Sequence, residues 1–69
     1  MRNDIYLKEL GNKIKTIRKS KNITLRQLGD LCDLHFGAIS EIENGKRNSY
    51  ILTLKSIADI LKVDVKDFI

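Results

Sequence analysis

The sequence contains no proline and no tryptophan, and it has one cysteine and one histidine among 69 residues. Without proline, and with few threonines and valines, the chain favours helix over strand. A single cysteine cannot form an internal disulfide, so we expect Cys32 to be a small buried apolar residue. No apolar run approaches the roughly 18 residues that span a membrane, and no signal peptide is recognisable. We therefore expect a cytoplasmic protein.

Catalytic and metal-binding patterns are also missing. The cysteine, the histidine and the scattered carboxylates give no nucleophile–base pair, no metal-ligand spacing and no phosphate-binding loop. A domain of this size buries only about 60% of its unfolded surface, which leaves little room for a substrate pocket of several hundred cubic ångströms beside a core. We predict one domain over residues 1–69 that is not an enzyme and binds no metal or cofactor.

Charge is distributed unevenly along the chain, whose net charge is +4. Residues 2–26 carry a net charge of +6, residues 27–45 carry −4, and residues 46–69 carry +2. Two basic segments thus flank an acidic one. A basic surface fits a phosphate-bearing partner, although the basic side chains of the first predicted helix, over residues 6–20, are equally compatible with a solvated helix face.

Apolar residues recur at helical spacing along most of the chain. This periodicity predicts helices over residues 6–20, 24–32, 35–44 and 52–62, and a last helical turn over 65–69. Thr24 and Gln27 form a capping box before the second helix, and Asp64 is placed to cap the last turn. We predict a compact all-α domain of five helices. Its expected core residues are Leu7, Leu10, Ile14, Ile17, Leu28, Leu31, Cys32, Leu34, Ile39, Ile42, Leu54, Ile57, Ala58, Leu61, Val65, Phe68 and Ile69.

The segment from Leu25 to Glu43 has the pattern of two helices that cross at a tight turn. Gly29 is unfavourable in a helix by about 1 kcal/mol relative to alanine, so we expect it to allow a close helix crossing. Asp33 tolerates the positive φ that such a turn needs, and Gly45 is placed to end the following helix in a left-handed conformation. These features predict a helix-turn-helix unit over about residues 24–44. Such a unit places its second helix in the major groove of DNA.

Over about residues 7–69 the chain resembles the phage repressor and Cro family of helix-turn-helix domains, also called the xenobiotic-response-element family. The resemblance rests on the strings IKTIRKSKNIT, LGDLCDL, ISEIENGKRN and TLKSIADILKVDVKDFI. It implies a lambda-repressor-like fold, a prokaryotic or phage context, and a sequence-specific regulator that binds double-stranded DNA. We expect a repressor that acts by occupying its operator.

The resemblance also implies roles for individual residues. Arg18 and Glu43 are expected to form a partly buried ion pair. Positions that match backbone contacts or flank the second helix of the unit are Thr24, Leu25, Arg26, Asn44, Lys46, Arg47 and Asn48. Positions that match the face turned toward base edges are His35, Phe36, Gly37, Ser40 and Glu41. Leu25, Phe36, Gly37 and Ala38 depart from the amide and polar side chains that are usual in the family.

These departures leave alternatives open. Glu41 is either solvated or accepts a hydrogen bond from cytosine, and Phe36 either contacts a thymine methyl group or folds back onto the core. His35 and Ser40 contact DNA or are neutral. The acidic segment and the apolar residues at 36–38 also fit a protein-interaction module, such as an antitoxin-like subunit. A weak homodimer through Phe68 and Ile69 is a further hypothesis.

Overall fold

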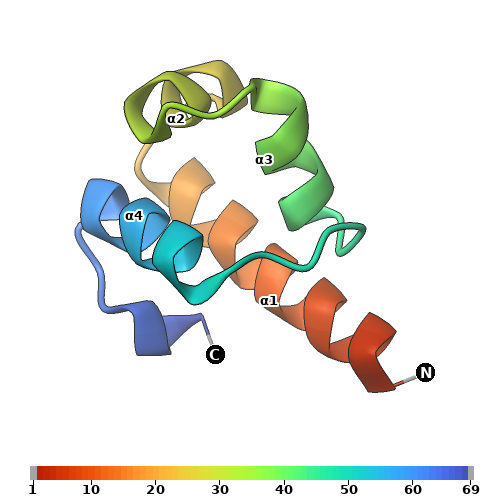
Figure 1. The fold of residues 1–69 in the computed structure, drawn as a ribbon. Coiled ribbons are helices and arrows are strands. Elements are labelled where there is room, and N and C mark those ends of the chain that lie inside the picture. Colours follow the sequence, from red (N-terminus) through yellow and green to blue (C-terminus); the bar gives the residue numbers. More distant parts are fainter. Residues whose placement is uncertain (1, 69) are drawn as a thin grey trace.

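The computed structural model describes residues 2–68, with side chains described from residue 5 onward. It contains four α-helices and one 3₁₀-helix, shown in Figure 1: α1 (Arg2–Ser20), α2 (Leu25–Cys32), α3 (Phe36–Glu43), α4 (Ile51–Leu61) and η1 (Val65–Asp67). The predicted all-α fold is confirmed. No helix in the described part of the chain is long and apolar enough to cross a membrane.

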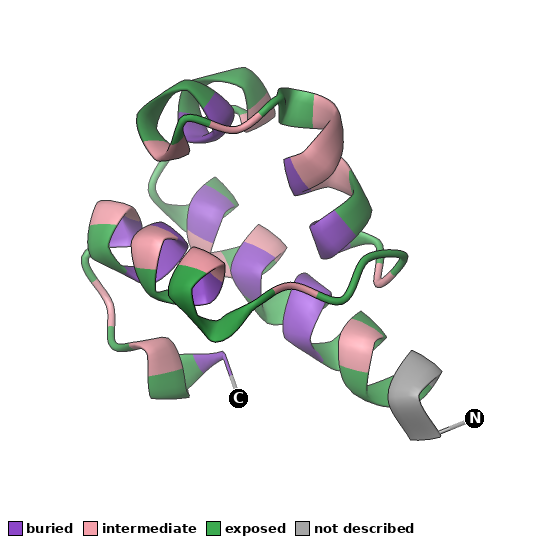
Figure 2. Cartoon of the chain, viewed as in Figure 1, coloured by how far each residue is buried: buried purple, intermediate pink, exposed green. Residues whose placement is uncertain are grey.

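The helices enclose one core. Helix α3 packs against both α1 and α2, α4 packs against α2, and η1 packs against α4. In Figure 1, α1 crosses the lower part of the molecule, with α2 and α3 above it and α4 to one side. The buried positions in Figure 2 lie on the helix sides turned toward one another. The buried apolar residues are Leu10, Ile14, Leu28, Ile39, Ile42, Leu54, Ile57, Ala58, Leu61 and Phe68.

Several sequence-based boundaries and burial predictions were wrong. The fifth helix is only the three-residue 3₁₀-helix η1, because so short a segment forms one turn and no regular α-helix. Helix α1 begins at Arg2 and not at residue 6, since apolar periodicity gives no signal in the polar start of a helix. Leu31 is 62% exposed because α2 buries the side that carries Leu28 and Gly29.

The dimer hypothesis is not supported where it relied on Phe68. This side chain is only 1% exposed and belongs to the core of its own chain, so it is not available to a second copy. Ile69, the other residue named for that interface, lies outside the described residues. Cys32 is half-buried and packs against the core. Burial raises the pKa of its thiol, and a hydrogen bond with Ser56 opposes this shift.

Gly11 brings α1 and α3 into close contact. A Cβ atom at this position would collide with the carbonyl oxygen of Ile42 and lie 2.5 Å from the carbonyl oxygen of Glu43. Only glycine has no side chain to place there. The glycine therefore fixes the C-terminal end of α3 directly over α1, a constraint that the sequence pattern alone did not reveal.

Candidate nucleic-acid interface

The turn between α2 and α3 has the geometry predicted for a helix-turn-helix unit. Asp33 ends α2 in the left-handed conformation, with φ 57° and ψ 42°. A Cβ atom at Gly29 would lie 2.6 Å from the carbonyl oxygen of Leu34, so the backbone of the turn passes directly over this glycine. Both predictions are confirmed. The turn holds α3 at a fixed angle across α2 and leaves one side of α3 uncovered.

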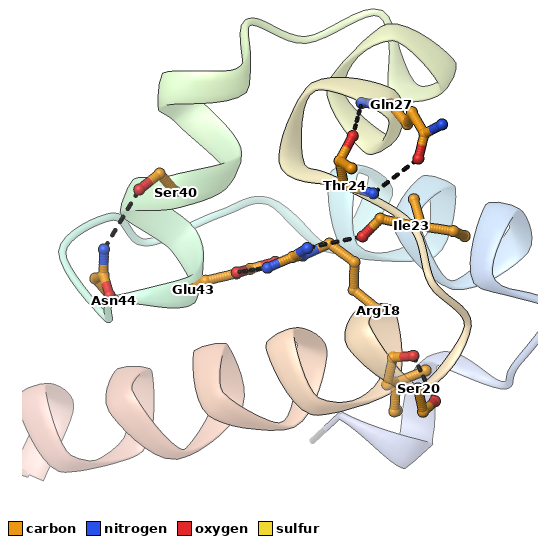
Figure 3. Close-up of polar contacts among 9 residues, drawn as sticks. Arg18, Ser20, Ile23, Thr24, Gln27, Ser40, Glu43 and Asn44 are labelled. Carbon is orange, nitrogen blue, oxygen red and sulfur yellow. Dashed lines mark hydrogen bonds and ion pairs between the residues drawn. The ribbon is translucent and has the colours of Figure 1, made fainter.

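The start of α2 carries the predicted capping box, drawn in Figure 3. The Gln27 backbone N–H donates to Thr24 Oγ1 over 3.0 Å, and the Thr24 N–H donates to Gln27 Oε1 over 2.9 Å. Leu25 and Arg26 lie between these two residues, and their backbone N–H groups have no acceptor within the helix because they belong to its first turn. The Leu25 side chain packs against the core, so only its backbone is offered outward. This end of α2 can bind an anion.

Helix α3 has one buried and one open side. Its buried residues are Ile39, Ile42 and Glu43. A helix advances 3.6 residues per turn, and this spacing places Gly37, Glu41 and Asn44 opposite the buried residues, with Ser40 beside them. Phe36 is the first residue of the helix and is exposed at its N-terminal end. We call the open surface the outer face of α3; its residues are Phe36, Gly37, Ser40, Glu41 and Asn44. Phe36, Glu41 and Asn44 are exposed, whereas Gly37 and Ser40 are half-buried.

His35 caps the N-terminal end of α3. Its Nδ1 atom accepts a hydrogen bond from the Gly37 backbone N–H over 3.0 Å. A neutral imidazole that accepts at Nδ1 carries its proton at Nε2, so the remaining nitrogen is a hydrogen-bond donor. The His35 ring stacks on Phe36 with centroids 4.7 Å apart. The Arg26 guanidinium carbon lies 4.8 Å from the centroid of the same Phe36 ring.

The loop between α3 and α4 (residues 44–50) turns back beside α3. Gly45 has φ +72°, which confirms the predicted left-handed end of the helix. Lys46, Arg47 and Asn48 are all exposed. Arg47 Nε lies 3.2 Å from Glu41 Oε1, and the side chains are 50% and 53% exposed. This pair, which was not predicted, joins the loop to the outer face of α3.

A small pocket with a mixed polar and apolar lining lies where this loop meets the start of α4. Its volume is about 180 Å³, and it is lined by Leu34, Ile42, Arg47, Asn48, Ser49, Tyr50 and Thr53. The Ser49 hydroxyl oxygen is buried and has no hydrogen-bond partner within the described chain. Tyr50, the N-cap of α4, makes no side-chain cap hydrogen bond. The first N–H groups of α4 are therefore open to an external acceptor beside the basic loop.

Arg18 and Glu43 form the predicted ion pair behind α3 (Figure 3). Arg18 Nε donates to Glu43 Oε2 over 2.6 Å, and Nη2 donates to Oε1 over 3.0 Å. The Arg18 guanidinium also donates to the carbonyl oxygen of Ile23 over 2.7 Å. The two side chains are only 7% and 3% exposed. The negative charge of Glu43 is thus paired with Arg18 inside the protein, and Glu41 is the acidic side chain that α3 presents outward.

Comparison with known proteins agrees with this geometry. The model of the family HTH_3, described as helix-turn-helix, matches residues 14–68. The control protein C.BamHI of Bacillus amyloliquefaciens is 40% identical over 70 residues, covering 100% of this chain and 85% of that protein. An uncharacterized HTH-type transcriptional regulator of Bacillus subtilis, RghRB, is 35% identical over 54 residues; the match covers 77% of this chain and 39% of the regulator.

Solved structures show the same fold. The clp gene regulator ClgR from Corynebacterium glutamicum superimposes with a TM-score of 0.88 at 28% identity, covering 91% of this chain and 67% of that chain. The restriction-modification controller protein C.AhdI from Aeromonas hydrophila also gives a TM-score of 0.88, at 21% identity, covering 91% of this chain and 96% of that chain. The family match spans most of the chain, including the whole of α2, the turn and α3. The protein belongs to the helix-turn-helix family HTH_3.

Proposed function

We propose that the protein is a sequence-specific transcriptional regulator that binds double-stranded DNA and represses by occupying its operator. The observation that carries this proposal is the outer face of α3, whose residues are exposed or half-buried and which is flanked by Arg26 on one side and by Lys46 and Arg47 on the other. Membership of the helix-turn-helix family and the names of its relatives support the same role. The proposal involves no catalytic step.

Phosphate contacts supply most of the affinity in this proposal. The open N–H groups of Leu25 and Arg26 at the start of α2 face one phosphate, in the way that helix N-termini bind anions. Lys46, Arg47 and Asn48, with the start of α4, contact the backbone on the other side of α3. Contacts of this kind set the position of the protein on the duplex but carry no sequence information themselves.

Sequence preference comes from the outer face of α3. Glu41 can accept a hydrogen bond from the N4 amino group of cytosine, and Ser40 can donate or accept at a neighbouring base edge. Glu41 is paired with Arg47 in the free protein. A phosphate that takes Arg47 therefore releases the Glu41 carboxylate for a base. In this arrangement the contact with the DNA backbone and the contact with cytosine favour each other.

We further propose that two copies occupy neighbouring half-sites. Helix-turn-helix proteins bind paired half-sites about one helical turn apart, and one such domain contacts only a few base pairs. With Phe68 buried in the core, the pairing surface lies elsewhere on the chain. A two-fold symmetric operator is the expected consequence of paired binding.

The direct test is fluorescence anisotropy with duplexes that carry a randomised centre, at several salt concentrations, followed by sequencing of the bound DNA. The proposal predicts binding that weakens with salt and an enriched sequence. Salt-sensitive binding without an enriched sequence would be consistent with the phosphate contacts but would contradict the recognition of bases by α3. Absence of binding even at low salt would contradict the proposal and favour the protein-interaction module, for which the partly exposed Phe36 ring is the specific observation.

A further inference from the structure

The Phe36 ring lies outside the core, and it is the exposed aromatic side chain that α3 carries. The residue is 40% exposed, and it does not belong to the cluster of residues that fill the interior. It is the first residue of α3. Of the two alternatives left open for Phe36, folding back onto the core is therefore the one that is wrong. The ring instead stands at the end of the outer face of α3 that lies nearest to α2.

Two polar neighbours hold this ring in place. The His35 imidazole stacks on it at an interplanar angle of 26°, and His35 is itself fixed by the hydrogen bond from the Gly37 N–H. The Arg26 guanidinium lies over the ring from the start of α2, in the geometry of a cation–π contact. The ring is thus pre-positioned by residues of both helices of the unit, and it remains accessible to a partner.

We propose that Phe36 recognises the C5 methyl group of a thymine in the major groove. A phenyl ring has no hydrogen-bond donor or acceptor, and the apolar group that a base pair presents in the major groove is the thymine methyl. The inference rests on the proposed function and deepens it by naming the base contacted at this end of α3. The Arg26 guanidinium, which lies over the same ring, can donate its N–H groups to a phosphate beside that thymine. The thymine contact of Phe36 and the phosphate contact of Arg26 would then form together.

The test uses the operator recovered by selection, in which each thymine is replaced in turn by deoxyuridine. This change removes only the C5 methyl group. At one thymine of each half-site the wild-type protein should lose about fourfold in affinity, the factor expected when one methyl group is no longer buried. At that position 5-methylcytosine should bind more tightly than cytosine by a similar factor. Equal affinity for cytosine and 5-methylcytosine there would overturn the proposal.

The Phe36→Ala variant supplies the other half of the test. It should bind the thymine operator more weakly than the wild type and show no further loss with deoxyuridine at the sensitive position. The matched control is Leu31→Ala, which truncates an apolar side chain that is 62% exposed on α2 and should retain the full deoxyuridine effect. Circular dichroism of each variant verifies that it is folded, and Phe36→Leu provides a second apolar variant that should keep part of the effect.

The outcomes separate this inference from the proposed function. If an operator is enriched but no thymine is sensitive to loss of its methyl group, the role of Phe36 is overturned and the regulator remains. If the sensitivity persists in Phe36→Ala, another residue contacts the methyl group and the inference is likewise overturned. If no sequence is enriched at all, sequence-specific recognition by α3 and the thymine contact of Phe36 fall together.

Discussion

Arg18 in α1 and Glu43 at the end of α3 lie 25 positions apart in sequence and form two hydrogen bonds, of 2.6 and 3.0 Å, inside the protein. Together with the close approach at Gly11, this pair fixes α3 against α1. The position of the outer face of α3 therefore depends on residues that do not belong to that face.

Removing one partner should destabilise the fold strongly. In Arg18→Met the Glu43 carboxylate would remain buried without its cation, and we expect a loss of about 3–5 kcal/mol in the free energy of unfolding. Urea denaturation measures this change. The double variant Arg18→Met/Glu43→Leu removes both charges and should recover most of the loss, because a buried ion pair can be replaced by apolar residues at little net cost. A double variant as unstable as the single one would contradict this explanation.

Two glycines should respond in opposite ways to alanine. Gly11→Ala places a methyl group against backbone carbonyl oxygens of α3 that cannot move aside, and we expect a loss of about 1–3 kcal/mol. At Gly37 the nearest atoms belong to the His35 side chain, at 3.0 and 3.4 Å, so alanine should be neutral or stabilising by up to about 1 kcal/mol. Thermal unfolding of both variants compares them, and a stable Gly11→Ala protein would refute the close approach of α1 and α3.

Glu41 should weaken non-specific binding while it contributes to specificity. Glu41→Gln removes a negative charge from the outer face of α3 and releases Arg47 from its ion pair. Affinity for random-sequence duplex should rise about two- to fivefold at low salt and the difference should fade as salt is added. The matched control, Asp59→Asn, makes the same charge change at an exposed position in α4 and should have little effect. An equal gain of affinity in both variants would mean that net charge alone determines non-specific binding, wherever the charge lies.

Arg47 should account for about one unit of the salt dependence. Affinity falls as salt concentration rises, so the slope of log affinity against log salt concentration is negative. When a residue contacts one phosphate, its substitution with alanine makes this slope less steep by about 0.9. Lys66→Ala removes the same charge from η1, where the Lys66 side chain is 78% exposed, and should leave the slope unchanged. Anisotropy titrations at four salt concentrations give both slopes. A slope that is the same in Arg47→Ala and in the wild type would exclude this phosphate contact.

Local chemistry made much of the fold predictable from the sequence. The capping box of Thr24 and Gln27, the left-handed positions Asp33 and Gly45, and the helix crossing at Gly29 are each specified by the residue that occupies the position. A side chain that satisfies an open backbone N–H, or a glycine where no Cβ fits, leaves few alternatives. The Arg18–Glu43 pair was inferred from the family resemblance, since nothing local links residues so far apart.

The unpredicted features depend on how elements meet in space. Periodicity grouped Leu31 with the buried residues of α2, but the side that α2 turns inward is set by its crossing with α3 at Gly29. The stacking of Arg26 on Phe36 joins the starts of two helices, and the Arg47–Glu41 pair requires the loop to fold back. The roles of these residues in DNA binding stay predictions, because they concern a partner that the fold alone does not include.

The most direct test of the account is a two-dimensional ¹H–¹⁵N NMR titration of the full chain with its selected duplex. We predict that the largest shift changes fall on three segments: residues 24–26 at the start of α2, residues 36–41 on α3, and residues 46–48 in the loop before α4. Residues 64–68 around η1 should change little. Shift changes concentrated around η1 or on the exposed side of α1, with α3 unaffected, would contradict the claim that the outer face of α3 binds DNA.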